Sequence, residues 1–178
     1  FWFYDGTDDG DATGNVDFSS VDKLFTTGGF SSFANTTAIL FELGANYNTQ
    51  AGSFYSVSGL NATLTGYSVA SRGDASPGVN QTATFAIAIP RTKVVTGLHD
   101  ISGDLTDLRL DSVSVATGTG DKGAGNFANQ PLYFGRRAGS SIPFSGREYL
   151  SVIRAGIPTA DQITAVERLI ADRQGRTI

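Results

Sequence analysis

Most of this chain consists of short runs of Phe, Val, Ile, Thr and Tyr, separated by clusters of Gly, Asn, Asp and Ser. Such runs are typical of short strands joined by tight turns, and 22 glycines against only 5 prolines fit that pattern. Since no helical segments separate the runs, we predict a two-sheet sandwich rather than strand–helix–strand units. Strands are expected over residues 38–43, 52–57, 66–71, 93–97, 132–135 and 148–154.

Two further segments carry more specific strand patterns. Residues 85–89 alternate large and small apolar side chains, which suits a strand with one face on the core. Residues 108–110 and 113–115 also alternate, and only Asp111 and Ser112 separate them. We therefore predict a hairpin with a two-residue turn at this point.

Only the end of the chain has helical periodicity. Thr159 followed by Gln162 forms a capping box, which predicts a helix over about 159–174. The apolar side chains of this segment recur at helical spacing, at Ile163, Val166, Leu169 and Ile170. We expect this stripe to dock on a sheet, with Glu167 and the other charged residues off it.

Composition excludes several classes of partner and site. The net charge is −4 and the 13 Lys and Arg residues are scattered, so nucleic acid is not an expected partner. The absence of cysteine excludes disulfides and thiolate metal sites. No apolar run approaches the roughly 18 residues of a membrane span, so no membrane insertion is expected. Because the sequence opens on Phe1 and contains no methionine, we expect the C-terminal part of a longer chain.

Motifs at both ends of the chain resemble one family. The opening Phe-Tyr-Asp-Gly-Thr-Asp-Asp at 3–9 is similar to the F-D-G-x-x-D opening of laminin-G-like, concanavalin A-like jelly-roll domains. Leu-Tyr-Phe-Gly-Arg at 132–136, Phe-Ser-Gly-Arg at 144–147 and Ile-Pro-Thr-Ala-Asp-Gln-Ile at 157–163 follow in the family order. With the Asp22-Lys23 pair, the chain most resembles the variety found at the C-terminus of bacteriophage and prophage virion proteins.

This resemblance implies an all-β fold, a two-sheet jelly-roll sandwich with one C-terminal α-helix, and a single domain over residues 1–178. One position departs from the family pattern, because Glu148 stands where the strand after the F-x-G turn usually has an apolar residue. Either this carboxylate is unpaired at a half-buried position, or it has a partner such as Arg136 or Arg137.

The segment from Phe3 to Phe18 is rich in aspartate, which leaves three interpretations open. Turns explain the Asp-Gly steps at 5–6 and 9–10 without a ligand, and this is the reading we favour. A calcium site would use Asp9, Asp11 and Asp17, but Ser20 stands at the twelfth loop position, so an EF-hand is excluded. A looser calcium site stays open, as does a catalytic acid cluster. No other cofactor is expected.

Motifs for catalysis are missing, and we predict no catalytic residues. Glycanases of this fold carry a Glu-x-Asp-x-x-Glu motif, and none of the three glutamates, Glu42, Glu148 and Glu167, lies in one. His99 lacks a nucleophile elbow and is interpreted as a loop histidine. The glycine-rich stretch 118–126 lacks the ending of a phosphate loop, so we interpret it as a long flexible turn or a binding loop.

The resemblance implies a non-catalytic virion module: a tail-fibre, spike or decoration domain on the particle surface. Its expected partners are host-surface polysaccharide or other virion proteins, and it is expected to be a homo-oligomer. Aromatic side chains that could stack on sugars are Trp2, Tyr47, Tyr55, Tyr67 and Tyr133. Tyr133, Arg136 and Arg137 are the candidate glycan contacts. The alternatives are a glycan-cleaving depolymerase and a purely structural capsid or tail component.

Overall fold

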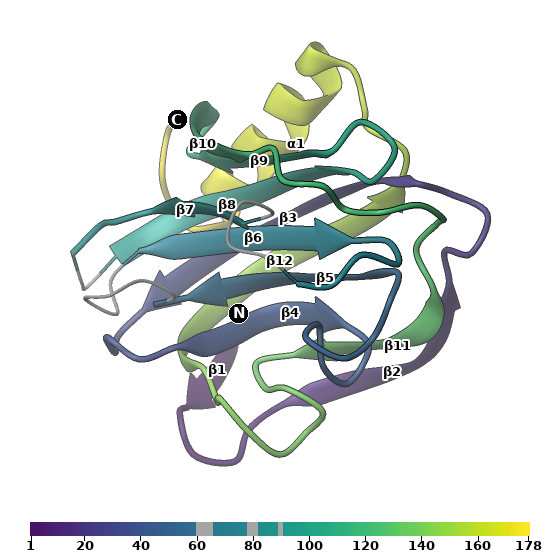
Figure 1. Cartoon of the computed structure of the whole chain (residues 1–178). Coiled ribbons are helices and arrows are strands. Elements are labelled where there is room, and N and C mark those ends of the chain that lie inside the picture. Colours follow the sequence, from purple (N-terminus) through teal and green to yellow (C-terminus); the bar gives the residue numbers. More distant parts are fainter. Residues whose placement is uncertain (60–65, 78–81, 89–90) are drawn as a thin grey trace.

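Two antiparallel sheets of six strands pack face to face in the computed structural model, which describes residues 1–59, 66–77, 82–88 and 91–178 (Figure 1). The first sheet contains, in spatial order, β1 (Trp2–Asp5), β12 (Ser145–Ala155), β3 (Lys23–Ser32), β8 (Arg91–Asp100), β9 (Leu105–Leu110) and β10 (Val113–Gly118). The second contains β2 (Asp11–Asp17), β11 (Asn129–Phe134), β4 (Ala38–Leu43), β5 (Ser53–Ser58), β6 (Tyr67–Arg72) and β7 (Thr82–Phe85). The predicted two-sheet jelly-roll sandwich is confirmed.

The core lies between the sheets, where each strand turns every second side chain inward. Phe30 of the first sheet meets Phe41 of the second with ring centroids 5.9 Å apart, and Phe41 meets Phe54 at 6.4 Å. Both edges of the sandwich bring the sheets together, β10 against β7 at one edge and β1 near β2 at the other (Figure 1).

Strand β3 is central in its sheet, yet the sequence patterns did not predict it. Its two consecutive glycines weaken the strand pattern in the sequence, but each lets a neighbouring element approach the backbone closely. A Cβ atom on Gly28 would lie 2.6 Å from Oγ of Ser151, and one on Gly29 would lie 2.7 Å from Cγ2 of Ile170. These glycines therefore let β12 and the C-terminal helix pack against the strand.

Two other strands differ from the sequence-based expectation. Strand β2 was not among the predicted strands. It is an almost fully exposed edge strand, where polar and acidic residues are tolerated because they discourage edge pairing. Strand β7 ends at Phe85, so the predicted strand 85–89 is wrong over residues 86–88, and Ile89 lies outside the described residues. The hairpin turn is confirmed.

The C-terminal helix α1 (Ala160–Arg173) begins at the predicted capping box, in which Oγ1 of Thr159 accepts a hydrogen bond from the backbone of Gln162. Ile163 and Ile170 are buried as expected, but the placement of Leu169 was wrong, because its side chain is 49% exposed. Glu167 takes the buried place instead, since residues 163, 167 and 170 share one face at spacings of four and three. Within the described residues, this 14-residue helix is too short to cross a membrane.

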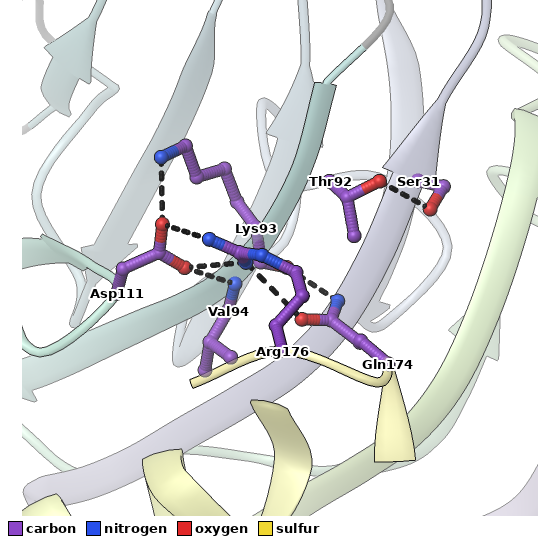
Figure 2. Close-up of polar contacts among 7 residues, drawn as sticks. All are labelled: Ser31, Thr92, Lys93, Val94, Asp111, Gln174 and Arg176. Atoms are coloured by element: carbon purple, nitrogen blue, oxygen red, sulfur yellow. Dashed lines mark hydrogen bonds and ion pairs between the residues drawn. The ribbon is translucent and has the colours of Figure 1, made fainter. Parts of the chain in front are cut away.

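Residues after α1 tie the helix to the first sheet around Asp111 (Figure 2). Its carboxylate accepts hydrogen bonds from Nζ of Lys93 at 2.6 Å, from Nη2 of Arg176 at 2.7 Å and from the backbone of Val94 at 3.0 Å. Although burial acts to raise the pKa of Asp111, the bonds from Arg176 and Lys93 prevail and lower it. These contacts hold the C-terminal end of the helix against the first sheet.

Candidate functional site

A cavity of about 430 Å³ opens at the edge of the sandwich where β1 and β12 of one sheet face β2 and β11 of the other. Strand β1 is short and pairs with β12 only from Ser145 to Glu148, so the next residues of β12 border the opening. The polar and aromatic side chains that line the cavity are Trp2, Tyr4, Asp11, Thr13, Phe134, Glu148, Tyr149 and Ser151. Two strands from the N-terminal end of the chain and two from its C-terminal part thus build one pocket.

A β-bulge shapes the centre of this pocket. The register of β12 against β3 shifts between Glu148 and Ser151, which brings these two side chains together. Oγ of Ser151 donates a hydrogen bond to Oε1 of Glu148 at 2.6 Å, and the Tyr4 hydroxyl donates one to Oε2 at 3.1 Å. Glu148 is only 6% exposed, so a carboxylate sits at the base of the pocket with hydroxyl partners.

Burial governs the ionisation of Glu148. It raises the pKa of this carboxyl, and the nearby negative charge of Asp11 raises it further, while the hydrogen bonds from Ser151 and Tyr4 lower it in part. Burial also raises the pKa of the Tyr4 phenol, so this residue stays a hydrogen-bond donor. The pocket therefore holds one buried carboxyl and one exposed carboxyl close together.

Neither arginine suggested as a partner of Glu148 reaches it. Arg137 pairs instead with Glu42, through Nε–Oε2 and Nη2–Oε1 contacts of 2.8 and 2.9 Å. Arg136 donates hydrogen bonds to the carbonyls of Asp8 and Ser140 at 2.7 and 3.2 Å. Both guanidinium groups thus have structural partners outside the pocket, and their role as glycan contacts stays a prediction.

Among the five candidate stacking residues, Trp2 lines the pocket and is 68% exposed. Tyr47, Tyr55 and Tyr67 are buried, which rules them out as surface platforms. Tyr133 is half-buried on β11 and its neighbour Phe134, not Tyr133 itself, lines the pocket. The indole of Trp2 is therefore the open aromatic surface at this site.

The aspartates proposed for calcium do not converge. Asp11 begins and Asp17 ends β2, so the usual rise per residue places them about 20 Å apart, and a single ion cannot bind both with Asp9. Asp9 instead lies with Asp5 and Asp8, whose carboxylate oxygens are within 4.8 Å of one another and exposed. Two of these carboxylates stabilise the turn: Asp5 accepts from the backbone of Thr7 at 2.7 Å, and Asp9 from that of Asp5 at 2.8 Å.

His99 is a core residue of β8, so its interpretation as a loop histidine was wrong. Its imidazole stacks on Phe54 at 5.4 Å and its Nε2 lies 3.0 Å from the hydroxyl of Thr26. Burial, with a smaller effect of nearby Lys122, lowers its pKa to about 3. A histidine that is fully buried and neutral is unsuited to act as a base on a surface ligand.

A second cavity, of about 380 Å³, lies among loops at residues 51–52, 73–74 and 124–128. Its lining is mostly Gly and Ala, with Asp74 and Asn126 as its main polar side chains. The glycine-rich loop beside it is well packed, because Lys122 is fully buried and Phe127 is 1% exposed. This cavity offers no aromatic platform open to solvent and is the weaker candidate.

Comparisons with known proteins agree with the fold. No protein-family model and no curated protein sequence matches the chain. The heptameric SAP-like pentraxin from Limulus polyphemus matches 93% of this chain and 80% of its own, at 14% identity and a TM-score of 0.70. The CBM40 domain of the Ruminococcus gnavus IT-sialidase, solved with α2,3 sialyllactose, matches 88% of this chain and 97% of its own, at 14% identity and 0.60.

Domains LG4-5 of the mouse laminin α1 chain match 85% of this chain and 40% of their own, at 14% identity and a TM-score of 0.61. At such identities the likeness shows the fold alone. The laminin-G-like, concanavalin A-like jelly roll implied by the sequence motifs is therefore confirmed, and a bacteriophage origin is not addressed by these structures.

Proposed function

We propose that this chain is a non-catalytic glycan-binding module and that the pocket between β1, β2, β11 and β12 is its binding site. The observation that carries this proposal is the exposed indole of Trp2 at the mouth of a pocket whose base holds hydrogen-bonding side chains. Sugar rings combine apolar faces with hydroxyl groups, so they suit a site that offers both a flat aromatic surface and fixed acceptors.

The polar groups of the pocket are arranged to receive hydroxyl donors. Asp11 is exposed at the start of β2 and can accept bonds from two neighbouring sugar hydroxyls. Glu148 is held in place by Ser151 and Tyr4, which fixes its remaining acceptor positions. Because strands position these side chains, the site is formed before the ligand arrives, which reduces the entropy cost of binding.

The similar structures support this proposal without establishing it. One of them was solved with a bound oligosaccharide, and another is named as a heptamer. Individual sugar contacts are weak, with Kd values of about 1 mM. Firm attachment to a glycan surface would therefore require several copies of the domain. From the resemblance of the end motifs to virion proteins, we propose that the module lies, as a homo-oligomer, on the surface of a virion, where it would bind host-surface polysaccharide or neighbouring virion proteins.

A matched pair of variants on one strand tests the site. Trp2 and Phe3 are both exposed on β1, but only Trp2 lines the pocket. Trp2→Ala should weaken binding to host-surface polysaccharide by about tenfold or more, because a stacked ring is lost, while Phe3→Ala should leave it unchanged. Equal losses in both variants, or no binding by the unmodified domain, would contradict the proposal.

Cleavage of the glycan is a second candidate because two carboxyl groups, Glu148 and Asp11, lie in the pocket. Glycosidases use one carboxyl of raised pKa as the acid and a second as the nucleophile or base. Binding is favoured because the sequence lacks the Glu-x-Asp-x-x-Glu motif that carries the catalytic carboxylates in glycanases of this fold. Incubation with the polysaccharide should release no reducing ends, and release that disappears in Glu148→Gln would establish the enzyme instead.

A further inference from the structure

The charges around the pocket are one-sided. Asp11 and Glu148 both line it, and none of the described residues that line it is a lysine or an arginine. The hydroxyl of Tyr4 donates a hydrogen bond to Glu148 at 3.1 Å, and its pKa is raised by burial and further by the negative charges of Glu148 and Asp11. An anionic ligand would meet two like charges here with no cation to offset them.

The three glutamates of the chain differ in whether a cation pairs with them. All are buried, and an arginine pairs with Glu42 and another with Glu167, each through two hydrogen bonds. Glu148 has only the hydroxyls of Tyr4 and Ser151, and no salt bridge to it occurs within the described residues. Glu148 therefore lacks the cationic partner that the other two glutamates have. Burying a carboxylate without such a partner costs folding free energy.

From this contrast we infer that the ligand supplies the missing cation: the glycan bound at this pocket contains an amino sugar whose amine is free and protonated. The inference deepens the proposed function and rests on it. Each oxygen of Glu148 has a lone pair beyond the one that accepts from Tyr4 or Ser151. An ammonium group provides three donors, enough to bond both Glu148 and Asp11.

The aromatic lining suits the same ligand. The indole of Trp2 is open to solvent beside the two carboxylates, so a sugar ring stacked on it would place a ring substituent within the acidic part of the pocket. An ammonium close to an indole face also gains a cation–π attraction. A neutral acetamido or hydroxyl group at the same ring position would bind without the ionic contribution.

A matched series of ligands isolates the charge. Chitosan, chitin and cellulose oligosaccharides of equal length share one backbone and differ only in carrying an ammonium, an acetamido or a hydroxyl group on each ring. Calorimetric titration of the domain should give about tenfold or greater preference for the chitosan oligomer, because charge-assisted hydrogen bonds contribute more than neutral ones. The preference should shrink as salt concentration rises.

Two variants locate the effect, and a third controls for overall charge. Glu148→Gln and Asp11→Asn should each reduce the preference for chitosan. Asp172→Asn, at an exposed position of α1, removes one charge that does not line the pocket and should not reduce it. Asp11 is exposed, so its variant tests the inference even where Glu148→Gln alters folding. Thermal melts of each variant confirm the folded state.

The outcomes separate the inference from the function on which it rests. Equal affinity for all three oligomers, lost in Trp2→Ala, would overturn the inference and leave the proposed function intact. A preference for chitosan that survives in both Glu148→Gln and Asp11→Asn would also overturn it. No binding of any oligomer or of host-surface polysaccharide would refute both, and equal affinity for a lysine-rich peptide would show an amine site that is not specific for sugars.

Discussion

Two regions at the first sheet differ in the partners of their buried carboxylates. Beneath α1, the carboxylate of Glu167 is bound by Arg109, and Asp111 is bound by Lys93 and Arg176. At the edge formed by β1 and β12, Glu148 has hydroxyl partners only and faces a cavity. Charges that the fold itself neutralises are structural. The buried carboxyl of Glu148, which lacks a cation and faces a cavity, is the feature on which our proposed ligand rests.

The largest expected effect lies in the region under the helix. Arg109→Ala would leave Glu167 buried without its cation and should lower the free energy of unfolding by about 3–5 kcal/mol. Glu148→Gln removes a charge that has no cation and should cost less than about 1 kcal/mol. Urea unfolding measures both variants, and similar losses would show that the two regions do not differ.

A second pair of variants tests how firmly the helix is docked. Ile170→Ala empties a buried position and should cost about 2–4 kcal/mol, whereas Leu169 is 49% exposed and its replacement by alanine should cost less than about 0.5 kcal/mol. The same unfolding measurement applies. A large loss in Leu169→Ala alone would mean that the helix is rotated relative to the face described here.

Acid should affect two buried groups, His99 in the core between the sheets and Glu148 in the pocket, with opposite sign. The pKa of His99 falls from 6.5 in the unfolded chain to about 3 in the folded one, so the unfolded chain alone binds a proton between these values. Stability should therefore decrease as pH drops below about 6.5, by at most about 1.4 kcal/mol per pH unit. Unfolding curves from neutral pH to about pH 4 measure this slope, which His99→Gln should flatten.

Glu148 makes the folded state less stable as pH rises, the reverse of the effect of His99, because burial raises its pKa above the ordinary 4.5. Its contribution to stability is present below that ordinary value and is lost as pH rises through the raised one. Relative to the unmodified domain, Glu148→Gln should therefore gain stability as pH increases. A difference that does not change with pH would show that the folded-state pKa of Glu148 is not raised.

The smallest expected effect concerns the exposed acids of the opening turn. Asp5 and Asp9 already accept backbone hydrogen bonds there, so we expect neither calcium nor a chelator to change the melting temperature. A ligand bound only by the folded state would stabilise it. A rise in melting temperature with calcium, lost in Asp9→Asn, would establish a cation site beside the pocket.

Local patterns in the sequence predicted much of the fold. The capping box of Thr159 and Gln162 located the start of α1, since both hydrogen bonds form within one turn of chain. The two-residue turn at Asp111 and Ser112 was equally local, and both residues have the positive φ angles, 49° and 70°, that such a turn requires. The motifs at the two ends of the chain indicated the jelly roll, and the similar structures confirm it.

Tertiary structure alone decided the strands whose partners lie far away. Strand β3 contains Gly28 and Gly29, which weaken any local strand signal, and its pairing with β8 and β12 makes it a strand nonetheless. Strand β2 carries an acidic sequence that is acceptable only at an exposed edge, and the sequence does not say which strand is at the edge.

The pocket was decided in the same way. The sequence marked Glu148 as a departure from its family pattern and Trp2 as a stacking candidate, but it could not show that they share a site. Trp2 lies opposite Glu148 because β1 pairs with β12, although these strands lie near opposite ends of the sequence. Asp11 joins them because the second sheet packs on the first. Turns and helix caps depend on residues that are neighbours along the chain, so the sequence determines them. The binding site is formed by residues that only the folded chain brings into contact.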